Sequence, residues 1–207
     1  MSQSDWSSDV CSSDLLGMSK LKKLDLGNNP TLECVFLKNV DVEDDTIFEN
    51  LNEINVSKCK NLRVIDIEQA GEKFTELDLS SNDKLNSLGL EGLRGLKQLK
   101  MPETDNLKEI VVKETALESL ALEKYTKLDK VCVGGNQFNT LKINMEQKTE
   151  KDIENMYLLF DNNLKVEFIS SKSGIVPNIK RLDNHNLWAG IVFSNYVVTD
   201  YEIPECW

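Results

Sequence analysis

The sequence contains one histidine, His185, which lies in the polar stretch 182–187. A Ser–His–Asp triad, a histidine general base or a histidine-ligated zinc site would each have to use this residue. The stretch lies outside the periodic part of the chain, in a segment that the sequence predicts as a loop. We therefore predict no catalytic residue, and we do not expect the protein to be an enzyme.

Carboxylates offer a second route to chemistry, because the chain has 35 Asp and Glu residues. Asp25 and Asp78 occupy the same outward position of alternate predicted strands, where a parallel β-helix carbohydrate-active enzyme would carry acids. Such an enzyme would need its acids on adjacent coils with basic partners, and Asn55 stands between these two. We interpret both acids as residues of an exposed face, and the enzyme is the weaker alternative.

Metal and thiol chemistry have equally weak sequence signals. Four acids at positions 41, 43, 44 and 45 offer the oxygen ligands that calcium prefers, but their spacing matches no EF-hand. We predict a solvated loop there, no metal site and no cofactor. The cysteines are scattered and form no CxxC pair, which predicts packing residues or free thiols and leaves any pairing open. They are Cys11, Cys34, Cys59, Cys132 and Cys206.

A short repeat organises most of the chain. The stretch 74–82 places large apolar residues at positions one, four and six and Asn at position nine, and the next unit begins eleven residues later. Ten to twelve residues separate successive units, except for one interval of 19. The units begin at Leu21, Leu32, Leu51, Leu62, Phe74, Leu85, Leu96, Leu107, Leu117, Leu128 and Phe138.

Each unit is long enough for one strand and one turn, because alternate side chains of a strand share a face. Two units then form a coil of about 22 residues with strands on opposite sides of a thin core. Successive coils stack their strands in parallel, about 4.8 Å apart. We predict a β-rich solenoid of nested half-repeats of about eleven residues, in which neighbouring coils bury one another's apolar side.

The chain resembles the leucine-rich repeat family over residues 21–143. The stretches 24–29 (Leu-Asp-Leu-Gly-Asn-Asn) and 77–82 (Leu-Asp-Leu-Ser-Ser-Asn) match the family signature. The near-eleven spacing is most similar to the short irregular bacterial repeats of Bacteroidetes surface and secreted proteins. The resemblance implies a leucine-rich-repeat solenoid that acts as a non-catalytic protein-protein recognition scaffold, secreted or at a bacterial cell surface.

Position nine of the family repeat holds Asn or Cys, whose side chain satisfies backbone groups at the bend after the strand. Asn29, Cys59, Asn82 and Asn136 fit this structural ladder. Six other units depart from it, which predicts an irregular ladder. Their residues at this position are Val40, Ala70, Leu93, Thr104, Thr115 and Tyr125.

The flanks differ from the predicted solenoid of residues 15–145. Residues 1–14 are rich in Ser and Asp and resemble a translated adapter, which predicts a non-native or disordered leader and a missing native N-terminus and signal peptide. Residues 146–207 are predicted to form a small α+β C-terminal cap. Its helix has Thr149 as N-cap and an apolar face of Ile153, Met156, Tyr157 and Phe160, and strands are predicted over 164–169 and 188–196.

Charge and the outward positions limit the partners. A net charge of -11 argues against nucleic acid and anionic membranes, and no apolar run approaches a membrane span. We predict a protein partner, with a glycan as alternative. It would bind either the polar outward side of one sheet or the apolar anchors Phe36, Val64 and Val111 of the other. A structural spacer in a larger surface protein is the other interpretation.

Overall fold

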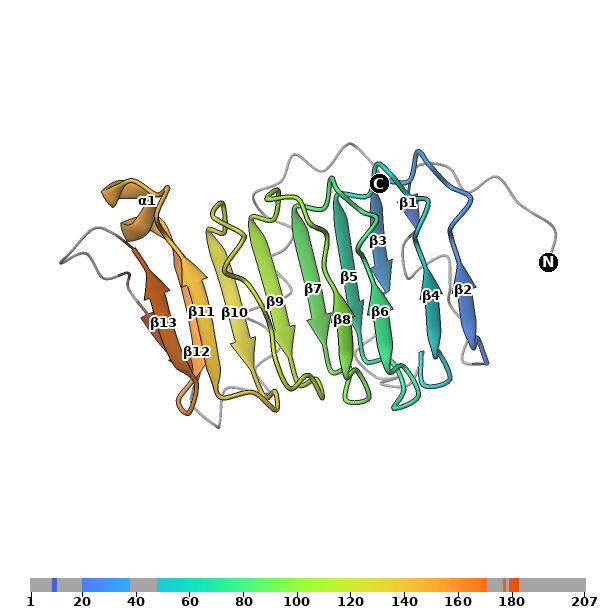
Figure 1. Ribbon diagram of the computed structural model, residues 1–207. Coiled ribbons are helices and arrows are strands. Elements are labelled where there is room, and N and C mark those ends of the chain that lie inside the picture. Colours follow the sequence, from blue (N-terminus) through green and yellow to red (C-terminus); the bar gives the residue numbers. More distant parts are fainter. Residues whose placement is uncertain (1–8, 11–19, 38–47, 171–176, 178, 183–207) are drawn as a thin grey trace.

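The computed structural model describes residues 9–10, 20–37, 48–170, 177 and 179–182. They form a solenoid of about five turns whose strands run parallel and stack from one end of the molecule to the other (Figure 1). The predicted β-rich solenoid of parallel strands is therefore confirmed. Residues 1–8, the acidic stretch 41–45, His185 and the predicted strand 188–196 lie outside the described residues.

Eight parallel strands form one continuous sheet, which we term the long sheet. Each strand pairs with the strand that lies one coil away in the sequence. In spatial order the strands are β1 (Asp9–Val10), β3 (Cys34–Leu37), β5 (Val64–Glu68), β7 (Ser87–Glu91), β9 (Glu109–Lys113), β10 (Lys130–Gly134), β12 (Tyr157–Asp161) and β14 (Ile179–Leu182).

The opposite side of the coils, which we term the short ladder, consists of three separate strand pairs. They are β2 (Lys23–Asp25) with β4 (Glu53–Asn55), β6 (Glu76–Asp78) with β8 (Gln98–Lys100), and β11 (Thr140–Asn144) with β13 (Lys165–Ile169). The predicted single sheet on this side is thus interrupted. The unit from Leu117 forms no strand, and only its Leu122 makes an isolated bridge, to Ile143.

The core is the column of inward side chains that the repeat predicts. Ile65, Leu88, Ile110 and Val131 follow one another in register across four strands of the long sheet, and none is more than 1% exposed. Across the core, Leu77 of the short ladder is also 1% exposed. Neighbouring coils therefore cover each inward side chain, which no coil does alone.

The C-terminal region corrects two expectations. Thr149 caps α1 (Glu150–Asn155) in a capping box with Asp152, as its sequence favours, but the helix ends at Asn155. Tyr157 and Phe160, predicted on the helical face, belong to β12, because this stretch pairs with β10. The predicted strand 164–169 is confirmed as β13. Strands β12, β13 and β14 continue both sides of the coils, so the predicted end of the repeat after Ile143 is wrong.

Strands β5, β7, β9 and β10 are each followed by a residue with left-handed backbone. These are Gln69, Gly92, Glu114 and Gly135, with φ between 50° and 69°. The recurrence shows that the coils turn in the same way at this edge, even where the residue is not glycine. Within the described part of the chain, no helix is long and apolar enough to cross a membrane.

Replacing an inward leucine tests the stacked core. We expect Leu77→Ala to lower the free energy of unfolding by about 2–5 kcal/mol, because it leaves a cavity between two coils. The exposed neighbour Thr75 provides the control, and Thr75→Ala should change stability by less than about 0.5 kcal/mol. Chemical denaturation measures both. Equal losses from the two variants would contradict the shared interior.

Candidate recognition surface

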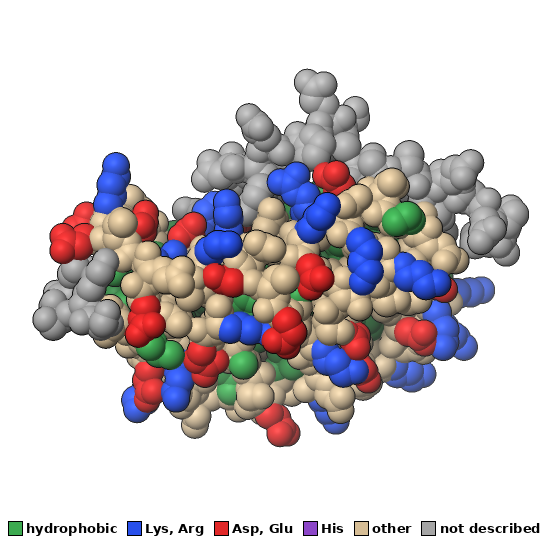
Figure 2. Space-filling model, turned by 45° about the horizontal axis from the view of Figure 1, so that its top comes forward, with side chains coloured by type: hydrophobic (Ala, Val, Ile, Leu, Met, Phe, Trp, Pro, Cys, Tyr) green, Lys and Arg blue, Asp and Glu red, His purple; other side chains and the backbone are tan. Residues whose placement is uncertain are grey.

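The outward side of the short ladder is an exposed, charged surface, which we term the polar face. Among its described residues, four lysines and five acids lie in two outward rows, together with three uncharged polar residues. One row holds Lys23, Glu53, Glu76, Gln98, Thr140 and Lys165, and the other holds Asp25, Asn55, Asp78, Lys100, Lys142 and Glu167. Figure 2 shows Lys and Arg side chains interspersed with acids on the side of the molecule that it draws.

Ion pairs join the charges of the polar face from strand to strand. Lys23 pairs with Glu53. Lys100 Nζ lies 3.1 Å from Glu76 Oε1 and 3.0 Å from Asp78 Oδ2. In the last strand pair, Lys142 Nζ of β11 lies 4.0 Å from Glu167 Oε2 of β13, and Lys165 of the same strand as Glu167 lies 2.9 Å from its Oε1. Exposed pairs of this kind contribute only about 0–1 kcal/mol each, so they set the pattern of charge on the surface more than the stability of the fold.

Four residues at the ends of the short-ladder strands cap the turns that follow. The side-chain oxygens of Asp25, Asn55, Asp78 and Asn144 each accept the backbone N–H two residues further on, at 2.9–3.1 Å. The hydroxyl and N–H of Ser80 also hold the pKa of Asp78 below its usual value. Asp25 and Asp78 are exposed, as predicted, and their role in the turns was missed. The signal was Asp or Asn followed two residues later by a small or polar residue.

The ladder residues hydrogen-bond to backbone carbonyl groups at the bends. Asn29 Nδ2 donates to Leu26 O within its own coil at 3.0 Å, and Cys59 Sγ donates to the same carbonyl from the next coil at 3.1 Å. Asn82 Nδ2 donates to Val56 O and Cys59 O, both at 3.0 Å. Burial raises the pKa of the Cys59 thiol, which fits this structural contact.

The same ladder continues through residues that the Asn-or-Cys pattern excluded. Tyr125 is fully buried, and its hydroxyl donates to Pro102 O at 2.7 Å. Thr104 Oγ1 donates to Asp83 O at 2.7 Å. On the long-sheet side, Asn136 Nδ2 donates to Val112 O, and its Oδ1 accepts hydrogen bonds from Thr115. Any side chain whose hydrogen-bond donor reaches the backbone carbonyl group can therefore fill this position.

The three predicted apolar anchors do not form a continuous patch. Phe36 and Val111 share one outward row of the long sheet, but Asp66 and Gly89 lie between them. Val64 belongs to another row and is only 9% exposed, while Phe36 and Val111 are half-buried.

The long sheet also buries outward side chains further along. Asp66 and Cys132 are each 3% exposed, Lys113 is 0% exposed, and burial raises the pKa of the Cys132 thiol to about 12. Cys59 and Cys132 are free thiols, Cys34 is buried, and Cys11 and Cys206 lie outside the described residues. The outward side of the long sheet is therefore less accessible than the polar face.

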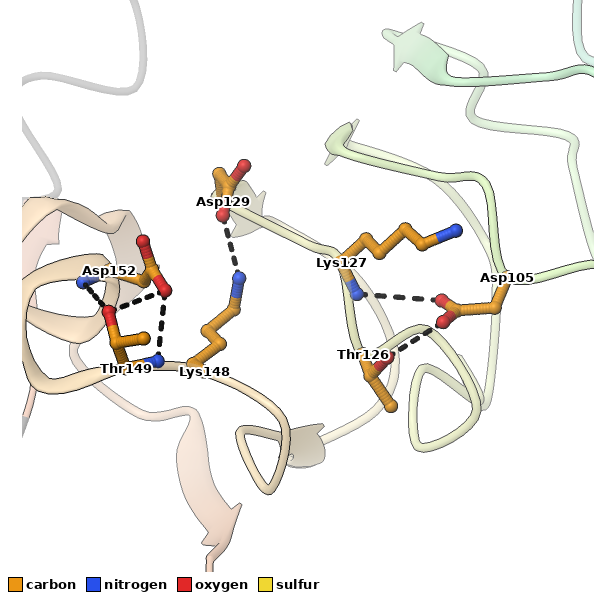
Figure 3. A network of polar contacts seen from close by, with 7 residues as sticks. All are labelled: Asp105, Thr126, Lys127, Asp129, Lys148, Thr149 and Asp152. Carbon is orange, nitrogen blue, oxygen red and sulfur yellow. Dashed lines mark hydrogen bonds and ion pairs between the residues drawn. The ribbon is translucent and has the colours of Figure 1, made fainter.

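A chain of polar contacts, the edge network, joins three consecutive coils where the turns enter the long sheet (Figure 3). Asp105 accepts from Thr126 Oγ1 at 2.7 Å and from the Lys127 N–H at 3.4 Å. Lys148, only 5% exposed, lies 2.6 Å from Asp129 Oδ1. The residue after Lys148 is the N-cap of α1. The network fixes the spacing of the coils and anchors the helix.

Comparison with known proteins adds no relative. No family model matches the chain, and no curated protein matches it either. Among the residues that the structure describes, no group of three or more His, Cys, Asp or Glu is arranged to hold a metal ion.

Removing one ladder donor tests the coil-to-coil bonds. Asn82→Leu keeps a side chain of similar size but leaves the Val56 and Cys59 carbonyls without this donor, so we expect a loss of about 2–4 kcal/mol. Ser81→Ala, one residue away and half-buried, is the control and should change stability by less than about 0.5 kcal/mol. Denaturation curves that coincide for the two variants would contradict the ladder.

Proposed function

We propose that this protein is a non-catalytic recognition scaffold of the leucine-rich-repeat class, with the short irregular repeats of bacterial surface and secreted proteins. Its partner is a protein that binds the polar face, and no cofactor takes part. The observation that carries the proposal is the difference between the two sides of the coils. The outward rows of the short ladder are largely exposed over successive coils, whereas outward residues of the long sheet such as Asp66 and Lys113 are buried.

The chemistry of the polar face supports a protein partner. Lysines and acids are mixed along it, with Lys100 held by ion pairs to Glu76 and Asp78, and Asp25 and Asp78 held by turn-capping hydrogen bonds. A rigid pattern of both signs favours a partner with the complementary pattern, because mismatched charges are penalised. A glycan is the alternative ligand, through the same donors and acceptors. The anchors Phe36, Val64 and Val111 are a weaker proposal, because Val64 is buried and Asp66 and Gly89 separate the other two.

The spacer function remains a second candidate, because one group of contacts favours it. The Cys59, Asn82 and Tyr125 bonds and the edge network tie each coil to the next, as a stiff extended element requires. A carbohydrate-active enzyme has less support. Asp78 accepts two hydrogen bonds from Ser80 and pairs with Lys100, which are the contacts of a turn-capping carboxylate on the surface.

Charge reversal on the polar face tests the recognition function. The chain is immobilised, partners are captured from the surface and medium of the cells that produce it, and each captured protein is purified for affinity measurement. We expect the double variant Lys100→Glu, Lys142→Glu to weaken the affinity of a true partner at least about tenfold, because charged contacts across the interface become repulsive.

The double variant Lys73→Glu, Lys127→Glu is the matched control. It changes the net charge equally at exposed positions away from the polar face, and it should leave affinity within about twofold. Equal losses from both double variants would contradict recognition by the polar face. Loss on Phe36→Ser and Val111→Ser alone would instead favour the apolar anchors, and the absence of any partner would favour the spacer.

A further inference from the structure

Asn55, one of the four turn-capping residues, combines a side-chain amide with a hydroxyl group two residues further on. The turn itself does not need both features. Asn55 Oδ1 accepts hydrogen bonds from Ser57 N at 3.1 Å and from Ser57 Oγ at 2.8 Å. Asn55 Nδ2 donates one hydrogen bond, to Asp25 Oδ1 at 2.9 Å, on the exposed side of the strand pair. The carboxamide is thus held by its oxygen, with its nitrogen on the polar face.

The other three positions lack one or both of these features. Asp78 caps the same turn with Ser80 but has no amide nitrogen. Asn144 has the amide, but its Nδ2 donates to Glu123 O at 2.9 Å, and the residue two positions on is Glu146, which has no hydroxyl. Asp25 is followed by Gly27, so neither feature is present. A turn cap therefore does not require an amide together with a hydroxyl.

The sequence Asn55-Val56-Ser57 has the form of an acceptor for an N-linked glycan, which is Asn-x-Ser/Thr with x other than Pro. It is the one such stretch in the chain, because Pro30 interrupts the only other candidate, Asn29-Pro30-Thr31. We propose that Asn55 is an N-glycosylation site, accepting an oligosaccharide from a lipid-diphosphate-linked donor. This inference does not rest on the recognition function, but Asn55 lies in an outward row of the polar face, so a glycan there would cover part of that surface.

The reaction would form a bond between Asn55 Nδ2 and C1 of the first sugar and break the bond between C1 and the donor's diphosphate oxygen. One amide proton goes to a base of the transferring enzyme, and the lipid diphosphate leaves. An asparagine amide carries two hydrogens, and Asp25 engages one of them. The glycosylated amide keeps one N–H hydrogen, so the nitrogen can still donate one hydrogen bond. Gly27 makes room, since a Cβ there would lie 2.8 Å from Asn55 Nδ2.

A transfer assay on the folded full-length chain tests the proposal. The chain is incubated with a single-subunit oligosaccharyltransferase and a lipid-diphosphate-linked oligosaccharide, and the sites are mapped by peptide mass spectrometry. We expect one glycan, on Asn55, and none on the Ser57→Ala variant. The peptide spanning residues 50–60 serves as the acceptor control in the same reaction.

Two variants, each of which creates a new Asn-x-Ser sequence, test whether the local geometry of the asparagine matters in addition to the motif. Asp78→Asn completes the motif at 78–80 with the same turn, and it should add a second glycan. Glu146→Ser completes it at 144–146, where the Asn144 amide is held by the Glu123 carbonyl, so little transfer is expected. Transfer to the peptide but not to the folded chain would overturn the proposal. Transfer to Asn55 that persists in the Ser57→Ala variant would overturn it as well, because the Asn-x-Ser motif would then play no part.

Discussion

The structure depends on the mutual burial of inward aliphatic side chains between adjacent coils. A coil of about 22 residues is too thin to enclose its own apolar side, so each one is stable only with neighbours above and below it. Leu88 is 1% exposed because Ile65 and Ile110 flank it in the adjacent strands of the long sheet. This constraint fixes the parallel register, and the register decides which side chains share an outward row.

The ladder and the edge network solve the second problem of a stacked solenoid, which is the backbone at the bends. Carbonyl groups there leave the strand pairing and must find donors in a largely apolar surrounding. Asn82 supplies two such bonds across coils, and Tyr125 supplies one from a longer side chain. Both sets of contacts lie in the turns that lead from the short ladder into the long sheet, so they hold this edge of the polar face from coil to coil.

Much of the fold could be predicted from the sequence, because the repeat spacing specifies strand, turn and inward position together. The exceptions have physical causes. Tyr157 and Phe160 have helical spacing, yet pairing with β10 decides their conformation, which a local pattern does not contain. Tyr125 was missed because the sequence pattern specifies Asn or Cys, whereas the position only requires a side-chain donor that reaches the carbonyl group of the neighbouring coil. The sequence did not show that Asp66 and Gly89 lie between Phe36 and Val111, because only the register between strands brings these four residues into one row. The sequence did contain the signal for the turn-capping role of Asp25 and Asp78, because a small residue follows each of them two positions later.

The shared interior is tested most directly by nuclear Overhauser contacts in the full-length chain. The backbone protons of Leu88 should show contacts to those of both Ile65 and Ile110, one coil before and one coil after it in the long sheet. Contacts of Leu88 confined to residues three and four positions away along the chain would indicate a helix. That result would contradict the stacked coils, and with them the polar face.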